Sequence, residues 1–113
     1  TPHRWVSNHI AVAWHPEAND VWASWQHDEA RAAEATALAA CNAVMRAGCT
    51  IASSGYNSSI AVAQNPDGFL YVAWGENKAK AKDNVLTQCV RPNCKIKHLF
   101  SVEAEWLPVD QFM

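Results

Sequence analysis

Ile10-Ala11-Val12-Ala13 recurs fifty residues later as Ile60-Ala61-Val62-Ala63. Further matches follow in the same order along both halves of the chain: Pro16 with Pro66, Trp25 with Trp74, Cys41 with Cys89, and Cys49 with Cys94. The spacing between matched residues falls from 50 to 45, as expected when loops shorten while the strands and helices stay in place. The sequence therefore predicts one domain over residues 1–113, built from repeats at about 9–53 and 59–102.

Each repeat has the pattern of two strands, a helix and a third strand. Apolar runs at 9–15 and 20–26 flank a turn that begins at Pro16, and the second copy has Pro66-Asp67-Gly68 at the matching place. Alanine-rich segments follow, from about 28 to 47 and from about Asn77, a good helix-capping residue. Short strands come next, at 49–53 and 94–102. We predict an α+β fold of two β-β-α-β repeats, with a largely antiparallel sheet and two helices packed on one face.

The four cysteines occupy matching places in the two repeats. None is separated from another by the two residues of a zinc knuckle, which favours disulfides over a metal site. Each copy has one cysteine toward the end of its helix and one at the start of the next strand. Of the three possible pairings, this placement favours Cys41 with Cys49 and Cys89 with Cys94. Because disulfides persist in oxidising compartments, we expect a periplasmic or secreted protein.

Charge and hydropathy exclude several classes of protein. The formal net charge is −2, which argues against a nucleic-acid binder held by bulk electrostatics. No apolar run approaches the roughly 18 residues of a membrane span. The charge is uneven, however: residues 59–98 carry six basic and three acidic groups, between acidic flanks. Lys95 and Lys97 lie in this basic part, and they are either solubilising residues or a docking patch for an acidic partner.

The six tryptophans divide according to the repeat. Trp25 and Trp74 match between the copies, so we predict that both are core residues. Trp22 and Tyr71 lie on the opposite strand face, and Trp14 matches Gln64 and has no aromatic counterpart. We predict Trp14, Trp22 and Tyr71 as binding residues, because exposed aromatic side chains commonly anchor interfaces. The alternative is that terminal segments cover that face, with Trp5 and Trp106 packed on it.

No set of residues for catalysis or for cofactor binding stands out. His9 is expected near His27 across the first hairpin, but two histidines at strand ends are more typical of surface residues than of a metal site. The cysteines are assigned to bridges, no serine lies in a Gly-x-Ser-x-Gly turn, and no glycine-rich phosphate loop occurs. We therefore predict no catalytic residues, no metal and no cofactor, with enzymatic activity the minority interpretation.

Together, the repeated Ile-Ala-Val-Ala strand, the alanine-rich helix ending in Leu38-Ala39-Ala40-Cys41, Gly48-Cys49 and Ala73-Trp74-Gly75 resemble the bacterial domain-of-unknown-function family numbered 4189. The resemblance covers residues 9–99 or so. It implies a small, exported, cysteine-bridged domain and supplies no catalytic residues. Members often carry a further cysteine before the second repeat's first strand, where this chain has Ser58 and Ser59.

These features favour a non-catalytic interaction domain that binds another protein. Its most concrete form is an inhibitor or immunity-type protein directed against a secreted toxin or hydrolase. The alternative is a module that binds glycan or peptidoglycan through exposed tryptophans. A secreted effector with hydrolase activity is the third hypothesis.

Overall fold

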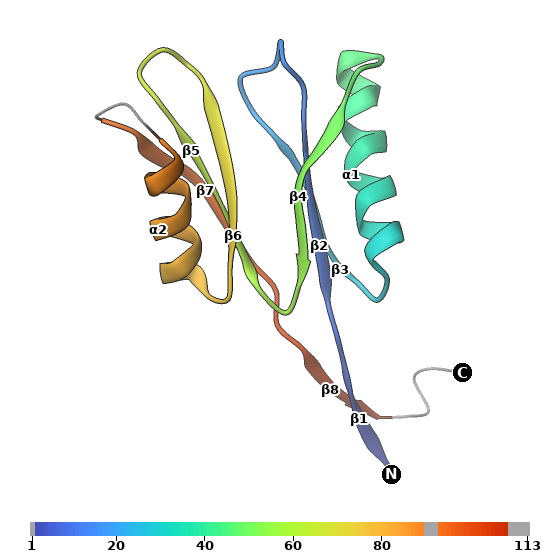
Figure 1. Ribbon diagram of the computed structural model, residues 1–113. Helices are drawn as coiled ribbons and strands as arrows, with labels where there is room; N and C mark the ends of the chain where they lie inside the picture. The colour runs from blue at the N-terminus through green and yellow to red at the C-terminus, as the bar shows by residue number, and fades with distance from the viewer. Residues whose placement is uncertain (1, 90–92, 109–113) are drawn as a thin grey trace.

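The computed structural model describes residues 2–89 and 93–108. Two helices and eight strands follow one another along these residues (Figure 1): β1 (His3–Val6), β2 (His9–Trp14), β3 (Trp22–His27), α1 (Ala30–Met45), β4 (Thr50–Tyr56), β5 (Ser59–Gln64), β6 (Leu70–Gly75), α2 (Lys78–Gln88), β7 (Lys95–Ser101) and β8 (Glu105–Pro108). The α+β class and the β-β-α-β order of both repeats are therefore confirmed.

Each repeat forms its own three-stranded antiparallel sheet. The strand order is β3-β2-β4 in the first repeat and β6-β5-β7 in the second, so the Ile-Ala-Val-Ala strand is central in both. The expectation of a single sheet carrying both helices was wrong in this respect. Each repeat supplies all three strands of one sheet. Each helix therefore packs on the sheet of its own repeat.

Both central strands are buried on both faces, and their alternating side chains differ in size accordingly. Ala11 and Ala13 pack beneath α1, together with Ala33, Ala37 and Cys41 of that helix. The matching Ala61 and Ala63 pack beneath α2 against Ala81 and Val85. Small side chains on both surfaces allow a helix to lie close to its sheet, so alanine is the residue that these layers need.

The larger residues of the central strands face the other repeat. Ile10, Val12, Ile60 and Val62 form one buried cluster with Val72 and Val102, and this cluster joins the two sheets. The molecule therefore has four layers, with the sheets facing each other and the helices outermost (Figure 1). β4 contacts β6 on one side of this sandwich, while Trp25 of β3 stacks on Phe100 of β7.

Each repeat has one disulfide, which connects its helix to the segment that leads into the next strand. Cys41 pairs with Cys49 and Cys89 pairs with Cys94, with Cα–Cα distances of 6.1 and 6.5 Å. Both predicted pairings are confirmed. Each bridge ties the C-terminal part of a helix to the residue just before the third strand of its sheet.

The terminal strands form a separate ribbon. β1 pairs with β8, and Trp5 and Trp106 pack on one another with ring centroids 5.2 Å apart. These tryptophans consequently do not cover a sheet face, contrary to the alternative considered from the sequence. Asn8 anchors the ribbon to the sandwich, since its side-chain amide donates to Glu105 Oε1 at 2.7 Å.

Trp25 and Trp74 are not core residues, although both lie on strands that face the inter-sheet cluster. Their exposed fractions are 51% and 45%. The middle of the space between the sheets is filled instead by Ile10, Val12, Ile60 and Val62 of the central strands. In the described part of the chain, no helix is long and apolar enough to cross a membrane.

Candidate functional site: the pocket between the two hairpin turns

A pocket of about 300 Å³ opens where the first hairpin turn approaches the second. The first repeat contributes Trp14, His15, Pro16, Ala18 and, from the start of β4, Thr50. The second hairpin contributes Gly68, Phe69 and Leu70. The pocket lies between the repeats, so neither copy could form it alone. Apolar side chains make up most of its lining.

Trp14 is the predicted binding residue that the structure places in this pocket. It ends β2, is half-buried, and packs against the inter-sheet cluster, as does Leu70. Phe69 lies across the pocket in the second turn and is 64% exposed. An anchored tryptophan beside an exposed phenylalanine offers a preformed apolar contact surface at low cost in side-chain entropy.

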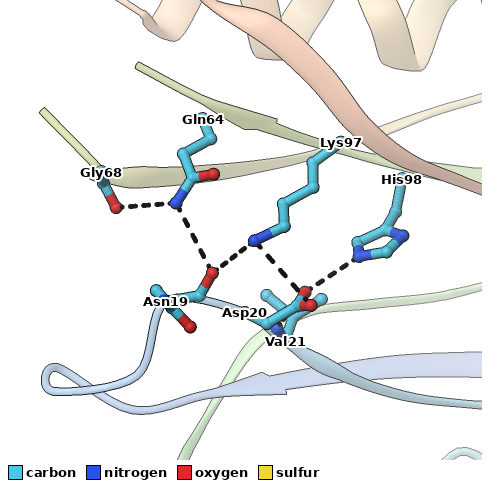
Figure 2. Close-up of polar contacts among 7 residues, drawn as sticks. All are labelled: Asn19, Asp20, Val21, Gln64, Gly68, Lys97 and His98. Atoms are coloured by element: carbon cyan, nitrogen blue, oxygen red, sulfur yellow. Dashed lines mark hydrogen bonds and ion pairs between the residues drawn. The ribbon is translucent and has the colours of Figure 1, made fainter. Parts of the chain in front are cut away.

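A polar network beside the pocket ties the two turns together (Figure 2). Lys97 of β7 donates to the backbone carbonyl of Asn19 in the first turn, and its Nζ lies 3.8 Å from Asp20 Oδ2. Gln64 donates to Asn19 O at 3.5 Å and to Gly68 O at 3.1 Å, so it reaches both turns. These contacts hold the two walls of the pocket in a fixed relation.

Asp20 is the carboxylate at the centre of this network. Its Oδ1 accepts from Val21 N at 2.8 Å and lies 2.9 Å from His98 Nε2. Burial by itself would raise the pKa of Asp20, but the Val21 N–H, His98 and Lys97 together hold this pKa below its usual value. Asp20 is therefore ionised at neutral pH and acts as an acceptor that joins the repeats.

Trp22 and Tyr71 lie elsewhere. Trp22 packs against the cluster beneath α1, and Tyr71 packs against the cluster beneath α2. The strand face predicted to be free is thus the face that the helices cover, since the neighbouring alanines of β2 and β5 point the same way. Trp22 and Tyr71 therefore lack the open aromatic surface that a binding residue needs.

Lys95 and Lys97 both line a second cavity, of about 540 Å³, next to the second turn. Lys95 is exposed, whereas Lys97 is half-buried and engaged with Asn19 and Asp20. The two lysines therefore differ in function: Lys97 holds the repeats together and Lys95 presents a charge.

Phe69, Leu70 and His15 are pocket residues that were not selected from the sequence. The sequence feature that pointed to the pocket was the mismatch of Trp14 with Gln64, because it marks a place where the two copies differ. That Phe69 lines the same pocket as Trp14 depends on how the two sheets face each other, which no local pattern encodes.

Two histidines lie at the end of the first hairpin that is away from its turn. His9 and His27 are register partners, as expected, but His9 stacks on Tyr56 and His27 hydrogen-bonds Ser24. Ser24 is buried. Over residues 2–89 and 93–108, no three histidine, cysteine or acidic residues gather as metal ligands would.

Comparison with known proteins identifies the family. The family model for a domain of unknown function, DUF4189, matches residues 9–100. The chain belongs to this family. The match spans both repeats of the DUF4189 domain, including both disulfides and the pocket between the turns. No curated protein and no solved structure matches the chain.

Proposed function

We propose that this DUF4189 domain is an exported, non-catalytic interaction domain that binds another protein through the pocket between its hairpin turns. The observation that carries the proposal is that the half-buried Trp14 and the exposed Phe69 line the same pocket, one from each repeat. Aromatic side chains, tryptophan and phenylalanine among them, are enriched at the centres of protein interfaces.

The surroundings of the pocket support binding by a rigid surface. Two disulfides fix the helices, and the Asp20 network connects the turns on either side. A surface held in its bound conformation loses little entropy on association. The most concrete form of the proposal is an inhibitor or immunity-type protein that occludes a secreted toxin or hydrolase. Disulfide bridging favours a periplasmic or extracellular location for such a protein.

The test is capture of a partner from bacterial envelope extract, followed by measurement of its affinity after purification. Phe69→Ala should weaken binding of that partner at least tenfold, because interface aromatics of this kind contribute 2 kcal/mol or more, roughly. Trp14→Ala should have a similar effect. Trp106→Ala is the control: this tryptophan is 53% exposed, against 64% for Phe69, but it lies in the terminal ribbon.

Unchanged affinity in Phe69→Ala would remove the pocket from the interface. Because Trp14 also packs on the core, the affinity of Trp14→Ala is interpreted only after circular dichroism shows that the variant has a native fold. Phe69 is an exposed turn residue, so its variant tests the proposal even if Trp14→Ala does not fold.

A second observation favours the glycan-binding alternative. Trp74 and the 61%-exposed Tyr56 line a groove of about 450 Å³ with His9, Ala30, Ser54 and Gly55. Exposed aromatic faces of this kind can stack on sugar rings. Titration with soluble peptidoglycan fragments should then quench tryptophan fluorescence, and Trp74→Ala should abolish the change. Equal quenching in this variant would exclude the groove as a glycan site.

A further inference from the structure

The ribbon formed by β1 and β8 has an aromatic surface of its own, separate from the Trp14 pocket. Trp5 and Trp106 are register partners and therefore lie on the same face, where their exposed fractions are 67% and 53%. The His3 ring extends this surface, stacked on Trp106 with ring centroids 5.6 Å apart. Two large exposed aromatic side chains in contact form an apolar patch of the kind that marks an interaction surface.

The ribbon extends away from the sandwich (Figure 1). Among residues 2–89 and 93–108, β1 and β8 pair only with each other, over four residues of each strand. Asn8 holds the base of the ribbon, because its side-chain amide donates to Glu103 O at 2.6 Å as well as to Glu105 Oε1. A two-stranded ribbon is only marginally stable in water, and three or more strands are needed for independent stability. The ribbon is therefore incomplete as a sheet.

The two edges of the ribbon differ in their capacity to pair with a further strand. β8 ends at Pro108, whose backbone nitrogen carries no hydrogen, and proline within a sheet is confined mainly to strands that remain at the edge. β1 has the sequence His3-Arg4-Trp5-Val6 and contains no proline, so its backbone can hydrogen-bond a further strand at every second residue. A third strand is therefore expected on β1.

The charges and the aromatic residues of the ribbon suit a second copy of β1 at this edge. Antiparallel pairing about Trp5 places Trp5 opposite Trp5 of the second copy, so that Trp5 and Trp106 of both copies form one row across four strands. Arg4 then lies opposite Val6 of the second copy, in the same row as that copy's Glu105, which brings opposite charges together. Pairing about Arg4 would instead set two arginines opposite each other, which is unfavourable.

We propose that the domain forms a two-fold symmetric dimer through β1, with a four-stranded sheet in the order β8-β1-β1-β8. An aromatic side chain buries roughly 150–250 Å², so the exposed parts of Trp5 and Trp106 supply at most roughly 300 Å² per copy. Two copies supply about 600 Å², half of the roughly 1,200 Å² at which stable interfaces begin, so the dimer is weak and depends on concentration. The hairpin turns lie at the other end of the molecule, and the Trp14 pockets of both copies therefore stay open (Figure 1).

Sedimentation equilibrium of the intact chain measures the dimer directly. The average mass should rise from 12.5 kDa toward twice that value as the concentration increases from about 10 µM to about 1 mM. Trp5→Ala should raise the dissociation constant of the dimer at least about tenfold, because Trp5 is the central residue of the interface. Phe69→Ala is the matched control: Phe69 is 64% exposed but lies at the hairpin turns, so its variant should stay within about twofold of the wild-type value.

Disulfide trapping tests the register and leaves Trp5 in place. Residues directly opposite on antiparallel strands have Cα atoms roughly 4.5–5.5 Å apart, within reach of a disulfide, whereas diagonal neighbours lie roughly 7–8 Å apart, beyond it. A mixture of Arg4→Cys and Val6→Cys chains should therefore form an intermolecular disulfide at least about fivefold faster than either variant alone. This experiment carries the test if Trp5→Ala disrupts the ribbon.

Three results would overturn the dimer: a mass that stays at 12.5 kDa up to about 1 mM, equal losses in Trp5→Ala and Phe69→Ala, or cross-linking that is fastest between two Arg4→Cys chains. Binding of a monomeric chain to phosphatidylglycerol vesicles, lost in Trp5→Ala, would also overturn it and assign the aromatic surface to a membrane. The inference goes beyond the proposed function. Its measurements need no protein partner, so their failure is distinguishable from failure of the Phe69 binding experiment.

Discussion

At the scale of single residues, a few differences between the copies decide where cavities form. Phe100 and Gly55 occupy matching places opposite Ile60 and Ile10. Trp25 stacks on the Phe100 ring, with centroids 5.8 Å apart, and that side of the sandwich is filled. A Cβ atom on Gly55 would lie 2.5 Å from Trp74 Nε1. Glycine therefore lets Trp74 lie directly over β4, beside the aromatic groove.

Asp20 permits a test of the link between the repeats. Because its folded pKa is lowered, its ionised form stabilises the protein above the unfolded pKa of about 3.9, and this contribution disappears as pH falls through the folded value. Asp20→Asn should lower the free energy of unfolding at pH 7 by about 1 kcal/mol or less, since the carboxylate is half-exposed. Urea unfolding should show this deficit at pH 7 and a smaller one at pH 3. An equal deficit at both values would contradict the assignment.

At the scale of elements, the two helices begin differently although they occupy the same place in the repeat. Asn77 caps α2, with its side chain accepting from Lys80 N at 2.9 Å. Glu29 precedes α1 and makes no such bond. α1 has 16 residues and the shorter α2 has 11, with fewer apolar residues along it. We infer that α2 depends more on its cap, because it buries less apolar surface against its sheet.

Alanine substitution of the two capping residues forms a matched pair. Asn77→Ala should lower the free energy of unfolding by about 1 kcal/mol, because an amide N–H at the start of α2 loses its acceptor. Glu29→Ala should change it by less than about 0.5 kcal/mol, as a surface substitution that breaks no bond. Thermal or urea unfolding measures both. Similar losses at the two positions would show that the cap bond contributes nothing specific.

At the scale of the whole molecule, the repeats behave as two halves of one core. The residues between the sheets come from both copies, and the side chains of Ile10 and Ile60 are almost completely buried there. Each sheet therefore has one face that its own helix covers and one that only the other repeat covers. A single repeat would expose that second face to water, which predicts that neither half folds alone.

Truncation of the central isoleucines tests this arrangement. Ile10→Ala and Ile60→Ala should each lower the free energy of unfolding by about 2 to 5 kcal/mol, as buried isoleucines do. The two losses should be similar, and both should appear in one cooperative unfolding transition, because the residues share a cluster. Separate transitions for the two variants would mean that the repeats are independent units.

Much of the fold could be predicted from local pattern. The matched cysteines were enough to predict both disulfide pairings, since helix ends and strand starts are encoded by neighbouring residues. The cap at Asn77 and the hairpin turns were predictable for the same reason. The candidate site was predictable only in Trp14, because the residues across the pocket and the polar network come from the other repeat.

Residue pattern alone was enough to predict the repeat, the α+β class, the order of the elements and the cysteine pairs, because helices, turns and strands are encoded by residues close along the chain. The tertiary structure decided which face of each sheet its helix covers, and therefore that Trp22 and Tyr71 are covered while Trp25 and Trp74 lie at the rim. Ile-Ala-Val-Ala is apolar on both strand faces, so alternation alone cannot say which face meets a helix. Side-chain size decides it: alanines admit the helix, while isoleucine and valine fill the wider space between the sheets.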